Sequence, residues 1–250
     1  MRRGIAGGRD EAKRLIAAGS VMVDGSSMVK PSTLVADSSA ISVAGDEARW
    51  ASRGALKLSH ALGEFGLDPT GVAALDVGAS TGGFTDVLLD GGAASVACVD
   101  VGYGQMVWRL AQDERVTVID RTNFRTVDPT SLGGPFNLVV MDVSFISVRL
   151  LTSQLAAVGA DDADYVVLVK PQFEVGRDGV GRGGIVTDPA AHADAVRTVA
   201  TALAGDEIGT VDVANSPITG SKGNHEFLLH GRLGSPFELT ETRIAEVTAP

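Results

Sequence analysis

Blocks of apolar residues alternate with blocks of helical spacing along most of the chain, and they predict strands and helices in turn. Apolar runs predict strands near residues 72–77, 94–99, 115–119, 136–141, 164–169, 207–214 and 225–230. Helical spacing predicts helices over 54–65, 82–90, 104–112, 147–158 and 188–204. This alternation is typical of an α/β domain whose mostly parallel sheet is covered on both faces.

The first fifty residues follow a different pattern, which predicts a small α+β module. Residues 9–18 have the spacing of a short helix that ends at Gly19, and a hairpin follows at 21–25. Residues 40–43 form another short strand, whereas residues 235–250 at the other end show no clear apolar period. The predicted organisation is a small domain over 1–46, a linker over 47–51, a large domain over 52–234 and a tail over 235–250.

A glycine-rich turn follows the first strand of the large domain. Gly78, Gly82 and Gly83 are spaced G-x-x-x-G-G, unlike the G-x-G-x-x-G of dinucleotide sites, and glycine lets the backbone approach a ligand closely. Asp76 would repel a pyrophosphate but could hold a cationic amino-acid group. Asp100, at the end of the next strand, is placed to accept the hydroxyls of a ribose. The pattern favours a nucleoside-type cofactor over a tight turn that binds no ligand. Of the two cofactors considered, it favours S-adenosylmethionine over NAD.

Charged residues at strand ends are the candidates for chemistry. Asp142 and Lys170 each end a buried strand, and Glu226 lies at the start of a late strand. A buried ammonium group is costly unless carboxylates pair with it, so these three residues form either a structural ion pair or a catalytic group. For Lys57, periodicity alone predicts a solvated side chain.

Composition and charge narrow the class of protein. Hydrophobic residues make up 44% and charged residues 21%, as in a soluble globular protein, and no apolar run approaches the roughly 20 residues of a membrane span. The net charge is −10, but residues 1–50 hold seven Lys and Arg against six Asp and Glu. Nucleic acid would therefore have to bind local basic clusters. The densest cluster is Arg2, Arg3, Arg9, Lys13 and Arg14.

Cysteine and histidine usage argues against a secreted, disulfide-bonded protein and against a metal-binding protein. The single cysteine, Cys98, cannot form an internal disulfide, and the N-terminus lacks the apolar segment of a secretory signal, so a cytoplasmic location is expected. The four histidines are scattered without the spacing of metal ligands, and we expect no metal site. They are His60, His192, His225 and His230.

Six blocks in order over residues 52–226 resemble the TlyA family, also called haemolysin A, in which an S4 RNA-binding module precedes an FtsJ-like methyltransferase domain. The blocks are Ser52-Arg53-Gly54-Ala55-Leu56-Lys57-Leu58, Asp76 to Thr85, Asp100 to Gln105, Asp142-Val143-Ser144-Phe145-Ile146-Ser147, Val169 to Gly176, and Gly223-Asn224-His225-Glu226. The S4 match lies in Gly19, Val21 to Gly25 and Lys30-Pro31-Ser32. Of the first helix of S4 modules and the R-x-G that follows it, only Arg2-Arg3-Gly4 remains, so we expect either a misplaced start codon or a truncated module.

The resemblance implies a Rossmann-like class I methyltransferase with a seven-stranded, mostly parallel sheet. The implied reaction transfers a methyl group from S-adenosylmethionine to a ribose 2′-hydroxyl of ribosomal RNA, usually at cytidine. The family's catalytic tetrad falls on Lys57, Asp142, Lys170 and Glu226. Lys170 is the expected base and must be neutral to accept a proton. Lys57 and burial favour its neutral form, whereas the carboxylates oppose it.

The resemblance and the charge pattern also indicate binding residues. Expected cofactor contacts are Asp76, Gly78, Ser80, Gly82, Gly83, Phe84, Asp100, Asp120, Asn123 and Asp142. Expected RNA contacts are Arg2, Arg3, Arg9, Lys13, Arg14, Lys30, Arg53, Phe173, Arg177, Arg182 and Lys222.

Three other functions compete with this interpretation. The family's haemolysin name suggests the hypothesis of a membrane-active toxin, although the sequence offers no export signal or apolar hairpin. A non-catalytic RNA-binding protein for ribosome assembly would not need the complete tetrad, and an NAD-dependent oxidoreductase conflicts with the glycine spacing. No membrane association and no obligate protein partner are expected. The sequence specifies neither the modified nucleotide nor the ribosomal subunit.

Overall fold

In the computed structural model the chain divides into two compact units, Met1–Arg53 and Gly54–Pro250. The structure describes residues 9–17, 20–23, 26–27, 30–36, 39, 41–43, 50–176, 179–220 and 222–249. Several predictions therefore lie outside the described residues. They are the RNA contacts Arg2, Arg3 and Arg177, the helix stop at Gly19, the turn at Asp24-Gly25 and most of the linker over 47–51.

The smaller unit contains a helix and a three-stranded antiparallel sheet. Its elements are α1 (Arg9–Ala17), β1 (Val21–Val23), β2 (Ser26–Ser27) and β3 (Ile41–Val43). β1 lies in the centre and pairs with both β2 and β3. The predicted helix, hairpin and later strand are thus confirmed, whereas the likeness of this unit to an S4 module stays a prediction.

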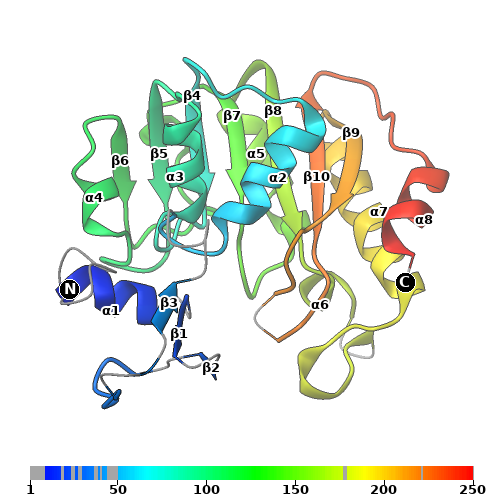
Figure 1. Cartoon of the computed structure of the whole chain (residues 1–250). Helices are drawn as coiled ribbons and strands as arrows, with labels where there is room; N and C mark the ends of the chain where they lie inside the picture. The colour runs from blue at the N-terminus through cyan, green and yellow to red at the C-terminus, as the bar shows by residue number, and fades with distance from the viewer. Residues whose placement is uncertain are drawn as a thin grey trace. The chain divides into compact units, whose positions relative to one another are not determined.

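The larger unit is built on a seven-stranded sheet in the order β6-β5-β4-β7-β8-β10-β9 (Figure 1). Its strands are β4 (Ala73–Val77), β5 (Ser95–Val99), β6 (Val116–Ile119), β7 (Phe136–Met141), β8 (Gly159–Val169), β9 (Ile208–Asn215) and β10 (Phe227–Leu233). β10 runs antiparallel to β8 and β9, while β4 to β8 pair in parallel. The predicted α/β class and mostly parallel sheet are confirmed. β8 begins at Gly159, earlier than predicted. The polar residues Asp161 and Asp162 interrupt the apolar pattern there, so the sequence did not indicate a strand.

Helices cover both faces of this sheet. The α-helices are α2 (Ala55–Phe65), α3 (Gly83–Asp90), α4 (Trp108–Ala111), α5 (Thr152–Val158), α6 (Pro171–Glu174), α7 (Pro189–Gly205) and α8 (Glu241–Thr248). Short 3-10 helices span Pro129–Leu132, Val148–Leu150 and Arg182–Gly184. In Figure 1, α2 and α3 lie together in front of the sheet, and α7 lies behind it against β9 and β10. Fully buried side chains such as Tyr165, Met141 and Phe227 fill the core.

Two predicted helices are shorter in the structure. The helix predicted over 104–112 is reduced to α4, because the residues before it form a loop. Gly102 N–H donates to Asp100 and Gly104 N–H to Asp120, each at 2.7 Å. The helix predicted over 147–158 begins with a 3-10 turn, which Ser147 caps, and becomes α-helical only at Thr152.

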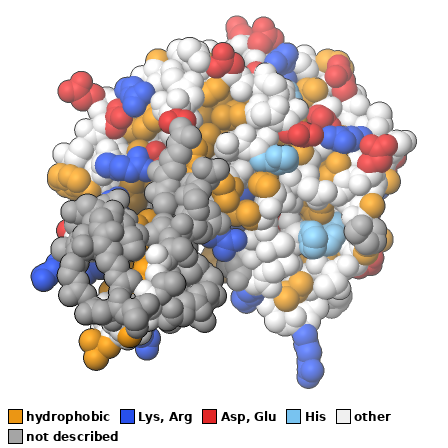
Figure 2. All heavy atoms as spheres, viewed as in Figure 1, with side chains coloured by type: hydrophobic (Ala, Val, Ile, Leu, Met, Phe, Trp, Pro, Cys, Tyr) orange, Lys and Arg blue, Asp and Glu red, His pale blue; other side chains and the backbone are white. Residues whose placement is uncertain are grey.

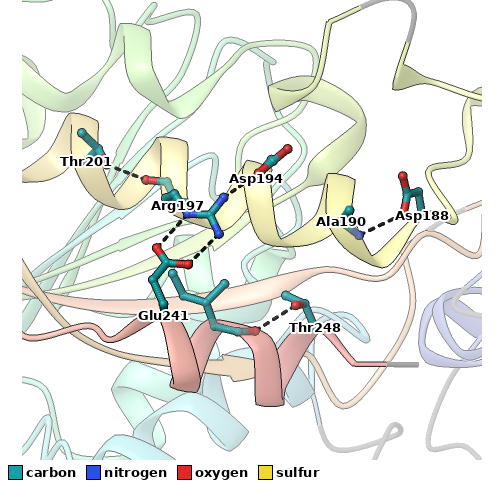
Figure 3. A network of polar contacts seen from close by, with 8 residues as sticks. Asp188, Ala190, Asp194, Arg197, Thr201, Glu241 and Thr248 are labelled. Atoms are coloured by element: carbon teal, nitrogen blue, oxygen red, sulfur yellow. Dashed lines mark hydrogen bonds and ion pairs between the residues drawn. The ribbon is translucent and has the colours of Figure 1, made fainter.

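The predicted C-terminal tail contains a docked helix, which corrects the prediction for residues 235–250. Arg197 on α7 donates to both carboxylate oxygens of Glu241 on α8, at 2.8 and 2.6 Å (Figure 3). Ile244 and Val247 are buried beneath it. A helix of eight residues needs only two apolar anchors one turn apart, so its period was too short to detect in the sequence.

Among the described residues, the charged side chains visible in Figure 2 do not form one basic patch. Figure 2 shows acidic side chains gathered along its upper edge and basic ones placed singly. Within the described ranges, no helix is long and apolar enough to cross a membrane. Those same ranges contain no group of three or more His, Cys, Asp or Glu arranged to hold a metal ion.

Candidate active site

The parallel strands deliver the predicted chemical residues to one edge of the sheet. Gly78 follows β4, Asp100 follows β5, Asp142 follows β7 and Lys170 follows β8. Gly78 has φ of +86°, and a Cβ there would lie 2.5 Å from the carbonyl oxygen of Asp142. Glycine is therefore required at this point, where the ends of two central strands come together.

A cavity of about 490 Å³ lies at this edge. It is large enough for a nucleoside-type ligand. Five of the predicted cofactor residues line it, namely Gly78, Ser80, Asp100, Asn123 and Asp142. The sequence analysis did not single out the other lining residues, which are Val77, Val99, Val101, Gln105, Thr122, Phe124, Val143, Ser144, Phe145, Ile146 and Leu151.

The Asp100 carboxylate is oriented by the backbone of the cavity loops. Its Oδ2 accepts a hydrogen bond from Ser80 N–H at 2.8 Å, and its Oδ1 accepts one from Gly102 N–H at 2.7 Å. Each oxygen keeps further acceptor capacity. The side chain is partly exposed and faces the cavity. Asp100 can therefore accept two neighbouring hydroxyl groups, as the sequence analysis expected of a ribose-binding acid.

Five predicted cofactor residues do not line the cavity, and their contact with a cofactor stays a prediction. They are Asp76, Gly82, Gly83, Phe84 and Asp120. Gly82 and Gly83 form the start of α3, and the Phe84 ring is buried in the core. Asp120 accepts the N–H of Gly104 and so ties two loops together. The glycine motif thus shapes the cavity mainly through Gly78 and Ser80.

Asp76 is a buried hydrogen-bond acceptor that precedes the glycine turn. Its side chain has no exposed surface, and its Oδ2 accepts bonds from the Thr85 N–H at 2.9 Å and the Thr85 hydroxyl at 2.6 Å. Burial raises the pKa of Asp76 to about 7, although the bonds from Thr85 oppose that rise. The Thr85 hydroxyl also lies 3.1 Å from the Cys98 sulfur. This cluster fixes α3 against β4 and β5.

The predicted tetrad is assembled beside the cavity as one chain of ion pairs. Lys57 Nζ lies 2.6 Å from Glu226 Oε2 and 3.6 Å from Asp142 Oδ2. Lys170 Nζ lies 2.5 Å from the other oxygen, Asp142 Oδ1. Asp142 therefore bridges both lysines and also faces the cavity. Periodicity was wrong about Lys57, whose residue is only 7% exposed.

Burial makes this chain of charges chemically unusual. Lys170 and Glu226 are also buried, at 8% and 4% exposure. Two ammonium groups and two carboxylates balance each other, which offsets much of the cost of removing them from water. Because the charges are equal in number, loss of one lysine proton leaves a net negative site next to the cavity. Such a site can take up the proton of an approaching hydroxyl group.

Aromatic rings flank the cavity beside the tetrad. Phe145, which lines the cavity, is 91% exposed and has φ of +67°. Its ring lies 5.4 Å from the ring of Phe173, measured between centroids. Phe173 was predicted as an RNA contact. Phe145 was missed, because an exposed aromatic residue three positions after a cavity aspartate leaves no periodic signal. Its left-handed backbone is a strained conformation for a phenylalanine.

The predicted RNA-binding residues fall into separate groups. Arg9, Lys13, Arg14 and Lys30 are exposed on the smaller unit, and Arg53 is exposed at its end. In the larger unit Arg182 and Lys222 are exposed on two loops. Buried Asn224 joins these loops, since its side chain donates to Gly184 O and accepts from Val186 N–H, each at 2.9 Å.

Residues 50–233 match the family model described as FtsJ-like methyltransferase. The chain is 50% identical over 232 residues to a Mycobacterium tuberculosis protein named 16S/23S rRNA (cytidine-2′-O)-methyltransferase TlyA, covering 92% of this chain and 86% of that one. A solved structure of a Streptococcus thermophilus protein named as a hemolysin aligns with a TM-score of 0.82 and 40% identity. That alignment covers 99% of this chain and 91% of the other.

A more distant solved structure supports the fold alone. It is a Burkholderia thailandensis N1-methyltransferase with bound S-adenosylhomocysteine, which aligns with a TM-score of 0.52 and 21% identity. The alignment covers 76% of this chain and 80% of that one.

Proposed function

The chain belongs to the FtsJ-like methyltransferase family, and we propose that it transfers the methyl group of S-adenosylmethionine to a ribose 2′-hydroxyl of ribosomal RNA. One observation carries this proposal. Asp142 lines the cavity and at the same time holds the buried Lys170 at 2.5 Å, so a base candidate lies beside a nucleoside-sized site. The name of the Mycobacterium tuberculosis relative supports ribosomal RNA as the substrate and cytidine as the modified residue.

The cavity residues fit S-adenosylmethionine. Asp100 offers carboxylate oxygens for the ribose hydroxyls, and the apolar walls include Val101 and Phe124 for the adenine. Gly78 and Ser80 border the same cavity. The bound group supplies an electrophilic methyl on a sulfonium sulfur. Asp100 gives the cavity a negative charge suited to a cation, whereas the charge of Asp142 is balanced by Lys57 and Lys170.

Lys170 acts as the general base in this proposal. S-adenosylmethionine held in the cavity would supply the methyl group, and Lys170 Nζ would accept the proton of the hydroxyl group that takes it up. Asp142 stabilises the resulting ammonium group at 2.5 Å. Lys57, held by Glu226 at 2.6 Å, fixes the opposite oxygen of Asp142 and keeps the carboxylate oriented. Positioning of this kind supplies much of the rate in a transfer that requires in-line attack.

The target nucleotide would be recognised beside this tetrad. Unpaired bases in RNA are commonly held by stacking on aromatic side chains. The exposed Phe145, with Phe173 against it, offers such a surface at the cavity. Arg182, Lys222 and Arg53 would contact phosphates, and the basic residues of α1 and Lys30 would contact RNA farther away. Ribosomal subunits in the cytoplasm are the proposed partners.

The test is methyl transfer from labelled S-adenosylmethionine to ribosomal subunits that lack the modification. Wild-type protein should place the label on a ribose 2′-oxygen of cytidine, and Lys170→Ala should place none. Label on a base nitrogen or carbon would reject ribose as the acceptor. Failure to bind S-adenosylmethionine at all would reject the reaction. A parallel erythrocyte-lysis assay with the same two proteins tests the membrane-active alternative directly.

A further inference from the structure

Lys170 has a second partner besides Asp142. Its Nζ donates a hydrogen bond to Ser144 Oγ at 2.9 Å, while Asp142 Oδ1 lies 2.5 Å away. Ser144 lies in the segment that follows β7 and lines the cavity. The ammonium end of Lys170 is therefore held between two acceptors that both belong to the loop after β7.

This pair of acceptors has a consequence for the neutral amine. A neutral lysine nitrogen carries two N–H bonds and one lone pair, arranged tetrahedrally with the bond to Cε. If one N–H points at Asp142 and the other at Ser144, the lone pair can occupy only the remaining position. We propose that Ser144 is a positioning residue, which orients the lone pair of Lys170 to accept the substrate hydroxyl proton. The inference rests on the proposed function.

The Ser144 loop is itself fixed to the segment that carries Lys170. Glu174 on α6 is 7% exposed, and its two oxygens accept bonds from the Ser147 hydroxyl at 2.5 Å and the Val148 N–H at 2.8 Å. Pro171, the first residue of α6, directly follows Lys170. The carboxylate of Glu174 thus links the helix that follows Lys170 to the segment that follows Ser144.

Loss of the hydroxyl has a defined effect on the base. In Ser144→Ala, Asp142 still fixes one N–H, but the amine can rotate about the Cε–Nζ bond and its lone pair is shared between two positions. We expect kcat to fall about two- to tenfold, because the lone pair is then correctly placed only part of the time and one hydrogen bond between neutral groups is lost. The KM values for S-adenosylmethionine and RNA should stay near those of the wild type. Ser144→Thr, which keeps a hydroxyl, should restore most of kcat.

The experiment is single-turnover and steady-state methyl transfer to ribosomal subunits by wild-type protein, Ser144→Ala, Ser144→Thr and a control. The control is Ser153→Ala, which removes an exposed hydroxyl from α5. A fall in kcat for Ser144→Ala alone, with rescue by threonine, is the expected result. An unchanged or faster Ser144→Ala would overturn the inference, and so would a change confined to KM for S-adenosylmethionine.

Two failures can be told apart. An active wild type whose Ser144→Ala variant is equally fast would reject Ser144 as a positioning residue and leave the proposed reaction standing. A wild type that binds S-adenosylmethionine but methylates no ribose would reject the proposed reaction and the Ser144 inference together.

Discussion

Two clusters centred on aspartates lie at the ends of neighbouring strands and have opposite characters. Asp76 lies inside β4, has no exposed surface and is bound by Thr85. Asp142 comes directly after β7, and 21% of its side chain is exposed between Lys57 and Lys170. Asp76 pairs in register with Val140, so Asp142 lies only two residues farther toward the cavity.

We propose that this small displacement separates a structural role from a chemical one. Asp76 has hydrogen-bond donors but no cation beside it, so burial dominates and raises its pKa to about 7. Asp142 has a lysine on each oxygen and an open side facing the cavity. A carboxylate inside the strand holds a helix in place, whereas one just past the strand end can organise a base. Substitutions in the two clusters should therefore have different effects on activity and on stability.

The largest effect should come from Lys170 in the Asp142 cluster. Lys170→Arg keeps a positive charge beside Asp142 but stays protonated, so it cannot act as a base. We expect kcat for methyl transfer to fall about 10²- to 10⁴-fold. S-adenosylmethionine binding, measured by calorimetry, should be retained. Wild-type activity in Lys170→Arg would show that the site needs only the charge of Lys170.

The Asp142 cluster was largely predictable from the sequence. Asp142 and Lys170 end strands whose apolar runs are unmistakable, and parallel strands bring such residues to one edge. Lys57 and Glu226 are 169 positions apart in the chain, so no local pattern could join them. The family resemblance placed them in one site, and the structure confirms that they meet. Ser144 and Phe145 were missed because their roles depend on contacts across loops.

The hydrogen bonds of Asp76 were not predictable for a related reason. The glycine motif marks the region as ligand-binding, but it does not reveal that Thr85 on α3 takes up the carboxylate. The short helix α8 escaped detection in the same way, since its packing against α7 through Arg197 is a tertiary contact. Strand positions therefore follow from local patterns, while the direction of a side chain near a strand end does not.

The next largest effect should be on the free energy of unfolding, which we expect to depend on pH because of the protonation of Asp76. Its folded-state pKa of about 7 exceeds the usual aspartate value of 3.8, so between these values the folded protein holds a proton that the unfolded chain has lost. Stability from this group is full below pH 3.8 and is lost as the pH rises through 7. The difference corresponds to about 4 kcal/mol.

Asp76→Asn isolates this contribution. The variant should remove the decline between pH 4 and 7, so the free energy of unfolding of the wild type should fall relative to Asp76→Asn across that range. Denaturant unfolding at several pH values measures the difference. If the free energy of unfolding depended on pH in the same way in both proteins, Asp76 would already be ionised in the folded state between pH 4 and 7, and its pKa would not be raised.

A smaller effect is expected at Thr85. Thr85→Val removes the hydroxyl that donates to Asp76 at 2.6 Å and leaves a buried oxygen with one donor fewer. We expect a loss of about 1–3 kcal/mol in the free energy of unfolding at pH 8. Thr85→Ser keeps the donor and serves as the control. The kcat of folded Thr85→Val should be unchanged, and a large fall in kcat would place this cluster in the chemistry.

The central claim is that Asp142 organises the reaction while Asp76 only supports the fold. The most direct measurement is the single-turnover rate of methyl transfer at pH 8 for Asp142→Asn and Asp76→Asn, both confirmed to be folded. Asp142→Asn should be slower by about 10²-fold, because both lysines lose their shared partner. Asp76→Asn should transfer at nearly the wild-type rate. Equal loss in both variants, or a larger loss in Asp76→Asn, would contradict this division of roles.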